Sequence, residues 1–158
     1  KALEIKPEFE VAHNLLGHCY TERGQWKASL EHLNRALALR PDYPAARYNR
    51  GYVYMKLSVG KRDHEYVDKA IADYQAALQS ELAANIVGDL HKALSDAYRQ
   101  KGELDQAIAE LEKYLKKAPH AKDALLVERK IRGLTLMKKG SAPPLGTKPE
   151  KAESETGG

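Results

Sequence analysis

The sequence predicts an all-α fold, an α-solenoid of helical hairpins that ends in a C-terminal capping helix. The first observation is an internal repeat, because five residues recur at a spacing of 34, a period typical of stacked helical hairpins. The recurring residues are Ala2, Leu3, Pro7, Gly17 and Tyr20, which return as Ala36, Leu37, Pro41, Gly51 and Tyr54. The second observation is that each unit contains two segments with apolar residues at the 3.6-residue period of a helix. Together they indicate paired helices stacked along one axis.

The first complete unit is expected over residues 10–43. Gly24 separates its two helices and Pro41 ends the second one. The apolar residues on the helical period are Val11, Leu15, Leu16, Cys19 and Tyr20, followed by Trp26, Leu30, Leu33 and Leu37. Residues 1–7 match the segment that closes this unit, so residues 1–9 are expected to be the end of a truncated preceding repeat.

The second unit is expected over residues 44–84 and the third over residues 88–121. The second is longer than the first, with a seven-residue insertion placed within residues 58–69. Three more residues lie near residues 85–87. Insertions in repeats usually map to loops, so both are expected outside the helices.

A capping helix is expected over residues 122–139, because four apolar residues share one face of it and charged residues the other. The four are Ala124, Val127, Ile131 and Leu134. Residues 140–158 consist mainly of Pro, Gly, Ser, Thr, Lys and Glu, with a single Leu145. Such a composition buries too little apolar surface to offset the entropy of ordering, so a disordered tail is expected.

These features resemble the tetratricopeptide-repeat (TPR) family, whose signature is Leu-Gly-x-x-Tyr, a glycine turn, a small residue and an aromatic in the second helix, and a closing proline. The matching residues, unit by unit, are Leu16, Gly17, Tyr20, Gly24 and Pro41; Gly51, Tyr54, Ala70, Tyr74 and Ala77; and Leu94, Tyr98, Gly102, Ala107 and Pro119. His13, Arg47 and His91 stand where the family often has tryptophan. The resemblance covers residues 1–139 and implies a right-handed superhelix, here a fragment of a longer TPR protein.

The resemblance also implies a function: a non-catalytic scaffold that binds a protein or peptide in a concave groove lined by the first helix of each unit. The expected groove residues are Asn14, His18, Tyr48, Asn49, Tyr52, Lys56, Lys92, Asp96 and Arg99, with Val11, Thr21, Ala45 and Asp89 beside them. Tyr48 and Tyr52 lie four residues apart on one helical face. They are either partner anchors or inter-repeat packing.

Two alternative functions come from other members of the family. One is a co-chaperone that clamps the acidic tail of a heat-shock chaperone with two asparagines and several cations. Only Asn49 fits that pattern, while Asp89 and Asp96 would repel an acidic tail, so this alternative is disfavoured. The other is an accessory segment of a larger enzyme or of a secretion or assembly component.

Basic residues collect near the C-terminal end, where a docking patch is expected at Lys116, Lys117, Arg129, Lys130 and Arg132. The patch is either a solvated capping face or a site for an acidic protein or a nucleic-acid backbone. The formal net charge of the chain is only +4, so nucleic-acid binding is not expected.

No residue pattern indicates catalysis. The single cysteine, Cys19, is expected to pack inertly in the core. The six histidines include no pair four residues apart, so neither a metal nor another cofactor is expected, and no small-molecule substrate. No run of eighteen apolar residues and no signal peptide is present, which argues against membrane insertion and leaves the compartment open, with the cytoplasm slightly favoured. Self-association is conceivable through the open N-terminal edge.

Overall fold

The computed structural model describes residues 8–60 and 64–140. Within these residues the chain forms seven α-helices, one short 3₁₀ helix and no strand. The elements are α1 (Glu8–Glu22), α2 (Trp26–Leu39), α3 (Pro44–Leu57), α4 (Glu65–Leu78), η1 (Glu81–Ala83), α5 (Val87–Lys101), α6 (Leu104–Lys117) and α7 (Ala124–Lys138). Of the disordered tail predicted over residues 140–158, all but Gly140 lies outside the described residues, as do residues 1–7 of the truncated repeat predicted over residues 1–9.

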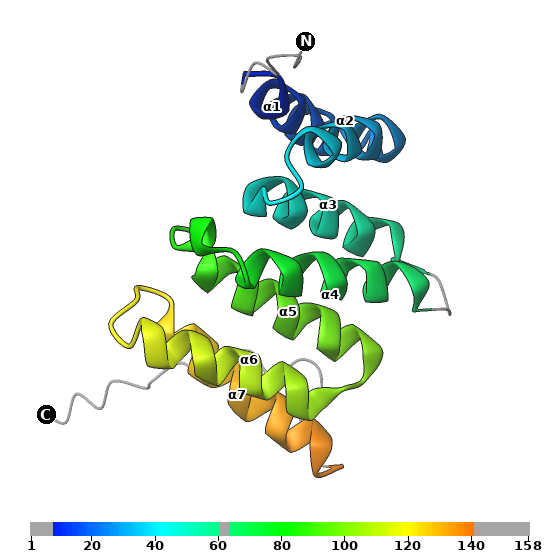
Figure 1. The fold of residues 1–158 in the computed structure, drawn as a ribbon. Coiled ribbons are helices and arrows are strands. Elements are labelled where there is room, and N and C mark those ends of the chain that lie inside the picture. Colours follow the sequence, from blue (N-terminus) through cyan, green and yellow to red (C-terminus); the bar gives the residue numbers. More distant parts are fainter. Residues whose placement is uncertain (1–7, 61–63, 141–158) are drawn as a thin grey trace, which may run out of the picture.

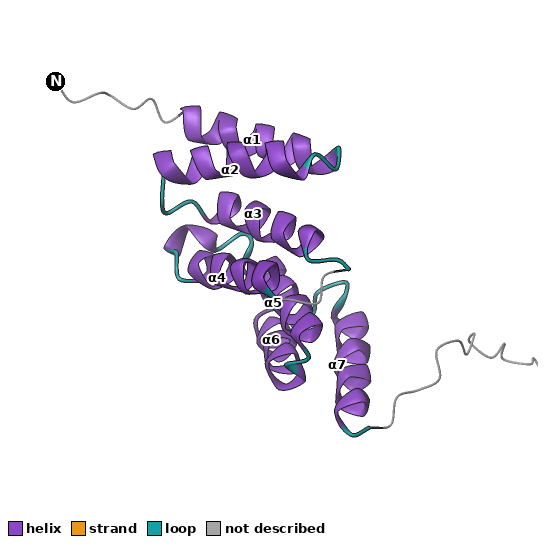
Figure 2. Cartoon of the chain, turned by 90° about the vertical axis from the view of Figure 1, so that its right-hand side faces the viewer, coloured by secondary structure: helices purple, strands orange, loops and turns teal. Residues whose placement is uncertain are grey.

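The helices form a stack of three hairpins, α1/α2, α3/α4 and α5/α6, with α7 packed on α6 at the end (Figures 1 and 2). Each hairpin contacts the next through its second helix, since α2 packs on α3 and α4 packs on α5. The first helices also adjoin one another, because α3 contacts both α1 and α5. The predicted all-α solenoid of hairpins with a capping helix is therefore confirmed.

Glycines at equivalent places allow the sharp turns inside the first and third hairpins. Gly24 has φ +69° and Gly102 has φ +80°, the left-handed region that costs glycine least. In the first turn the amide of Gln25 donates to the carbonyl of Tyr20, and in the third that of Glu103 donates to Tyr98. These bonds satisfy the last carbonyls of each first helix and reverse the chain.

The core is a row of three apolar clusters, each at the junction of a hairpin with the element that follows it. The first joins α2 to α3 through Leu33, Ala36, Leu37, Ala46 and Val53. The second joins α4 to α5 and has nine buried members, Val67, Ala70, Ile71, Tyr74, Ala77, Ala83, Leu90, Leu94 and Ala97. The third joins α6 to α7 and includes Val127 and Leu134 of the capping helix. Each hairpin thus buries its apolar face against its neighbour, as stacked repeats require.

Within the first two hairpins, a glycine lets the second helix approach the backbone of the first. A Cβ added to Gly17 would lie 2.6 Å from Leu33 Cγ, and one added to Gly51 would lie 2.5 Å from Tyr74 Cε1. Real Cβ atoms do not come that close to a neighbouring carbon. The missing side chain therefore makes room for Leu33 and Tyr74.

A polar pair also joins the two helices of each hairpin, at the three positions where tryptophan is common in the TPR family. The pairs are His13 with His32 (3.0 Å between their Nδ1 atoms), Arg47 with Asp73 (3.5 Å) and His91 with Glu110 (2.7 Å). The partners are 19 residues apart in the first and third hairpins and 26 in the second. The chain between the paired positions is therefore seven residues longer in the second hairpin than in the other two.

Cys19 lies on the surface, so the prediction that it packs in the core is wrong. Cys19 does lie on the apolar face of α1 that the helical period predicts. No helix of the described structure packs against that face. Leu15 and Leu16, on the same face, are 57% and 44% exposed. An apolar period identifies the face of a helix that is suited to burial, but not whether another element covers it.

Gly51→Ala is expected to lower the free energy of unfolding by about 1–3 kcal/mol, because the added methyl group must displace Tyr74. Gly133→Ala is the matched control. Gly133 also lies inside a helix, but a Cβ there would have no neighbour within 4 Å. Gly133→Ala is therefore expected to raise the free energy of unfolding by up to about 1 kcal/mol. Urea denaturation of the two variants measures the contrast. Equal effects would contradict the close approach of α4 to α3.

Candidate functional site

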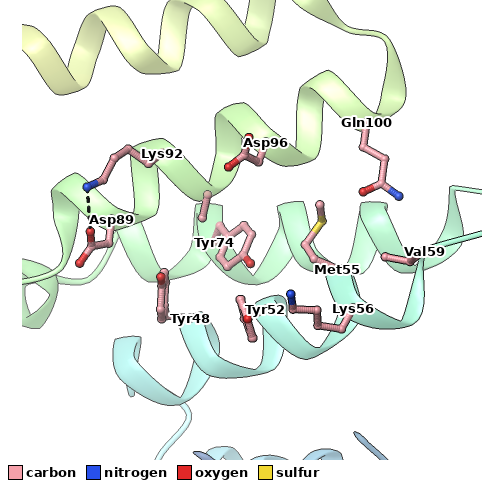
Figure 3. Close-up of a pocket in the computed structure, with 11 residues that line it drawn as sticks. Tyr48, Tyr52, Met55, Lys56, Val59, Tyr74, Asp89, Lys92, Asp96 and Gln100 are labelled. Atoms are coloured by element: carbon pink, nitrogen blue, oxygen red, sulfur yellow. Dashed lines mark ion pairs between the residues drawn. The ribbon is translucent and has the colours of Figure 1, made fainter. Parts of the chain in front are cut away.

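A hollow on the first-helix side lies between α3 and α5 and is floored by a residue of α4 (Figure 3). Its volume is about 360 Å³. The lining residues are Tyr48, Tyr52, Met55, Lys56, Val59, Tyr74, Asp89, Lys92, Ala93, Asp96 and Gln100. We call this space the α3–α5 hollow.

Tyr74 forms the floor of the α3–α5 hollow (Figure 3). It reaches the hollow from α4 because Gly51 leaves space for its ring beside the backbone of α3. The side chain is only 1% exposed, and no group in the described chain hydrogen-bonds its hydroxyl. Burial, with smaller effects from Tyr48 and Asp73, raises the pKa of this hydroxyl far above its ordinary value. The group therefore stays protonated and can donate a hydrogen bond into the hollow.

Tyr48 and Tyr52 form a ridge on α3 between this hollow and a second one. The second hollow lies between α1 and α3, has a volume of about 160 Å³, and is lined by His18, Thr21, Glu22, Tyr48, Asn49 and Tyr52. Tyr48 also packs inside the molecule, with its ring centroid 5.9 Å from that of Tyr74. Burial, followed by the charge of Asp89, raises the pKa of Tyr48. Tyr52 is 39% exposed, so it offers more of its surface to a partner.

Most of the charges around the α3–α5 hollow are already paired within the chain. Lys92 lies 3.2 Å from Asp89, the ion pair drawn in Figure 3. The carboxylate of Asp96 is 2.7 Å from Lys130. Lys56 differs, because its ammonium group lies 4.9 Å from the ring centroid of Tyr52 and forms no ion pair within the described residues. It is the cation that remains available to a ligand at this site.

The structure brings most of the predicted groove residues to these two hollows. Tyr48, Tyr52, Lys56, Lys92 and Asp96 line the larger one, and His18 and Asn49 line the smaller one. Arg99 is exposed on α5 but lines neither.

Asn14, a predicted groove residue, lines neither of the two hollows. It is only 8% exposed. Its Oδ1 accepts a hydrogen bond of 2.9 Å from Asn49, and its Nδ2 donates one of 3.4 Å to the hydroxyl of Tyr43. Asn14 therefore joins α1 to α3 and supports the wall of the groove. The same bond occupies the amide nitrogen of Asn49.

The expected groove set lacks several lining residues, among them Met55, Val59, Tyr74 and Gln100 of the larger hollow and Glu22 of the smaller one. Met55 and Gln100 follow Tyr52 and Asp96 by three and four positions, so the helical period could have placed them on the same face. Val59 lies beyond the end of α3, where that period no longer applies. Tyr74 matches the second-helix aromatic of the family signature, and no sequence signal shows that it also lines the hollow.

The predicted basic patch is divided between two helices. Lys116 and Lys117 are exposed at the end of α6, while Arg129 and Arg132 are exposed on α7. Lys130 is paired with Asp96 across the helix packing and is not free. Of the neighbouring lysines, Lys113 pairs with Glu110 and Lys138 with Asp105. Carboxylates from earlier parts of the sequence thus reduce the local excess of positive charge.

Residues 8–60 and 64–140 offer neither a metal-binding cluster nor a membrane-spanning helix. No group of three or more histidine, cysteine, aspartate or glutamate side chains there could hold a metal ion. No helix among them is both long enough and apolar enough to cross a bilayer.

Two family models match the chain. Residues 17–58 match a model described as a TPR repeat, and residues 60–122 match one described as a tetratricopeptide repeat. The chain belongs to the tetratricopeptide-repeat family. A comparison with curated protein sequences found no match.

Solved structures of several other proteins share the fold. The first TPR of Spaghetti (RPAP3), bound to the HSP90 peptide SRMEEVD, is 14% identical with a TM-score of 0.71, and the match covers 87% of this chain and 99% of that one. The type III secretion translocator chaperone SycD of Yersinia enterocolitica is 14% identical with a TM-score of 0.72, covering 86% and 90%. A thermophilic TPR protein of Thermus thermophilus is 26% identical with a TM-score of 0.64, covering 83% and 66%.

Tyr74→Phe is expected to leave the unfolding free energy nearly unchanged at pH 8 and to remove part of its decline in alkali. In the unfolded TPR chain the hydroxyl ionises with the ordinary pKa of 10.0, whereas the folded state keeps it protonated. The group therefore has no effect on stability below pH 10 and lowers stability as the pH rises above it. At pH 11 the wild type should have lost about 1.4 kcal/mol more than the variant, measured by urea denaturation. Parallel declines would contradict the burial of this hydroxyl.

Proposed function

We propose that this chain is a non-catalytic scaffold that mediates protein–protein interaction by holding a segment of another protein or a peptide in the groove on α1, α3 and α5. The observation that most supports this is the unbonded hydroxyl of Tyr74 on the floor of the α3–α5 hollow. The ring is buried but the hydroxyl oxygen is not enclosed by the described chain, so a ligand in the hollow can accept its hydrogen bond. At the equivalent place the first hairpin carries Leu33, which offers no such group.

The chemistry of the α3–α5 hollow favours one kind of anchor. Tyr52 and Met55 supply apolar surface, while Tyr74 and Lys56 supply hydrogen-bond donors. The anchor is therefore a side chain with an apolar body and an accepting oxygen at its tip, or an apolar side chain beside a backbone carbonyl. Aromatic residues such as Tyr52 are frequent anchors in protein interfaces, because they bury a large area at a small entropic cost.

The smaller hollow continues the groove towards α1 and has a different character. Glu22 lies at its edge, is exposed, and forms no ion pair within the described chain. Glu22 and Lys56 occupy equivalent places in successive repeats, 34 residues apart. A partner segment that crosses the ridge of Tyr48 and Tyr52 therefore meets an unpaired anion over one hollow and an unpaired cation over the other. This polarity would set the direction in which the segment binds.

Recognition of chaperone tails is the weaker alternative. The TPR of RPAP3 is bound to an HSP90 peptide, but the likeness to it shows only a common fold. In this chain the amide nitrogen of Asn49 is occupied by Asn14, and Lys92 is paired with Asp89 and Asp123. The groups that would clamp a terminal carboxylate are thus engaged elsewhere. A role as an accessory segment of a larger enzyme or assembly is compatible with the same groove.

A crosslinking capture from the native lysate tests the groove. Tyr52→Ala combined with Lys56→Ala removes two exposed side chains of the groove, and Tyr74→Phe removes only the hydroxyl on its floor. Both variants are expected to fold, as checked by circular dichroism. Both are expected to lose at least about tenfold of the captured partner, a loss equivalent to one good anchor contact.

The matched control is Leu82→Ala, an exposed apolar residue of η1 that lies outside the groove. It should capture the same partner as the wild type. If all the variants recover the same proteins as the wild type, the groove assignment is wrong.

A titration with the peptide SRMEEVD separates the two interpretations of the groove. We expect its affinity to be at least about tenfold weaker than that of the captured partner, because Asp89 and Asp96 border the site and its lysine there is paired. Fluorescence anisotropy of the labelled peptide measures this. Tight binding that is lost on Lys92→Ala would favour the chaperone-tail function instead.

A further inference from the structure

The side of α7 that faces away from α6 carries four large apolar side chains. α7 packs on α6 through Val127, Ile131 and Leu134 (Figure 2). The helical period places on the opposite side, which we call the outer face of α7, the apolar residues Leu125, Leu126, Leu136 and Met137. They are 78%, 64%, 42% and 49% exposed, in that order. A capping element normally turns a polar face outward, whereas this one offers apolar surface suited to contact with another molecule.

Two arginines occupy the middle of the outer face of α7. Arg129 and Arg132 lie three residues apart, between the apolar pair of the first turn and the apolar pair of the last. Both are exposed, and neither forms an ion pair within the described residues. Lys130 and Lys138 of the same helix, in contrast, are both paired with carboxylates. The outer face is therefore apolar, then basic, then apolar along the helix axis.

Gly133 lies on the same face, and the described chain gives no packing reason for it. Glycine is a poor helix former, and Gly17 and Gly51 are explained by the side chains that fill the space beside them. A Cβ on Gly133 would have no neighbour within 4 Å. The missing side chain would instead let the backbone of another helix come close to the middle of the outer face.

The two arginines decide which kind of occupant fits the outer face. A helix like α4, which covers α5 with apolar side chains, would bury Arg129 and Arg132 without a counter-ion, and an unpaired buried charge is strongly unfavourable. A second copy of α7 would set arginine against arginine. A nucleic-acid backbone would pair with the arginines but leave the four apolar side chains uncovered. The fitting occupant brings carboxylates to the middle and apolar side chains to both ends.

We propose that the outer face of α7 is a docking surface for an acidic amphipathic helix of another protein. Two of its carboxylates pair with Arg129 and Arg132, whose planar guanidinium groups can each make two parallel hydrogen bonds. Its apolar side chains lie on the two apolar pairs, whose first members, Leu125 and Leu136, are eleven residues apart. Recognition of a helix by anchors spaced along one face is a common mode of protein interaction. This surface is separate from the groove on α1, α3 and α5.

A designed peptide serves as the probe. It is an amidated, fluorescein-labelled helix of alanine and glutamine that carries two leucine pairs at the spacing of the outer face and two glutamates between them. We expect it to bind the full chain in fluorescence anisotropy. Arg129→Ala combined with Arg132→Ala should weaken binding at least about tenfold, because two charge-assisted pairs are lost. Leu125→Ala should weaken it at least about threefold, because less apolar area is covered. A peptide with glutamine in place of both glutamates should bind at least about tenfold more weakly.

Two further variants serve as controls. Lys116→Ala combined with Lys117→Ala removes the same charge from an exposed place at the end of α6 and should bind the probe as the wild type does. Gly133→Ala separates binding from folding. It is expected to stabilise the fold and yet to weaken binding at least about threefold, because the added methyl group holds the two helices apart.

Three results would overturn the proposal. Equal binding of the glutamate and glutamine peptides would show that the arginines do not select the occupant. An equal loss in the double lysine variant would show that only overall positive charge matters. The third is a failure of the glutamate peptide to bind; binding of vesicles of phosphatidylcholine and phosphatidylserine that Leu125→Ala abolishes would then identify a membrane surface as the occupant.

Discussion

The α3–α5 hollow depends on one contact, the close approach of α4 to the backbone of α3 at Gly51. Without a Cβ at Gly51, the ring of Tyr74 lies against the first helix, and its hydroxyl reaches the opposite side. One side chain therefore belongs both to the core and to the groove. In the first hairpin Leu33 takes the equivalent place beside Gly17, so no polar group reaches the surface there. The character of each hollow thus depends on which side chain fills the space that the glycine leaves.

The groove also depends on contacts that hold adjacent first helices together. Asn14 and Asn49 bond between α1 and α3, and Lys130 of α7 reaches Asp96 of α5. These contacts use polar groups that would otherwise compete for a ligand. They leave Lys56 and the tyrosine hydroxyls, that of Tyr74 among them, as donors in the larger hollow. Specificity in such a groove comes from the few groups that the fold leaves unpaired.

The sequence was sufficient to predict the hairpins, because the 34-residue repeat and the helical period reflect constraints local to each unit. It also grouped Tyr48, Tyr52 and Lys56, which line the α3–α5 hollow, since their grouping follows from the face of a single helix. It misplaced Asn14 and Cys19, and it missed Tyr74. The environment of each of these residues depends on a second helix. Asn14 lies beside α3, Cys19 is covered by no helix of the described residues, and Tyr74 extends from α4 towards α3. Such information is tertiary, so helical periodicity does not contain it.

The polar pairs inside the hairpins have a consequence for how such arrays change in evolution. His13, Arg47 and His91 are each matched to a different partner on the second helix of the same hairpin. Duplication or loss of a whole hairpin keeps every pair intact. Duplication or loss of a single helix would set one half of a pair against a foreign surface, at a cost of about 1–3 kcal/mol for each unsatisfied group. The unit of inheritance in this solenoid is therefore the hairpin, and the two helices within it must change together.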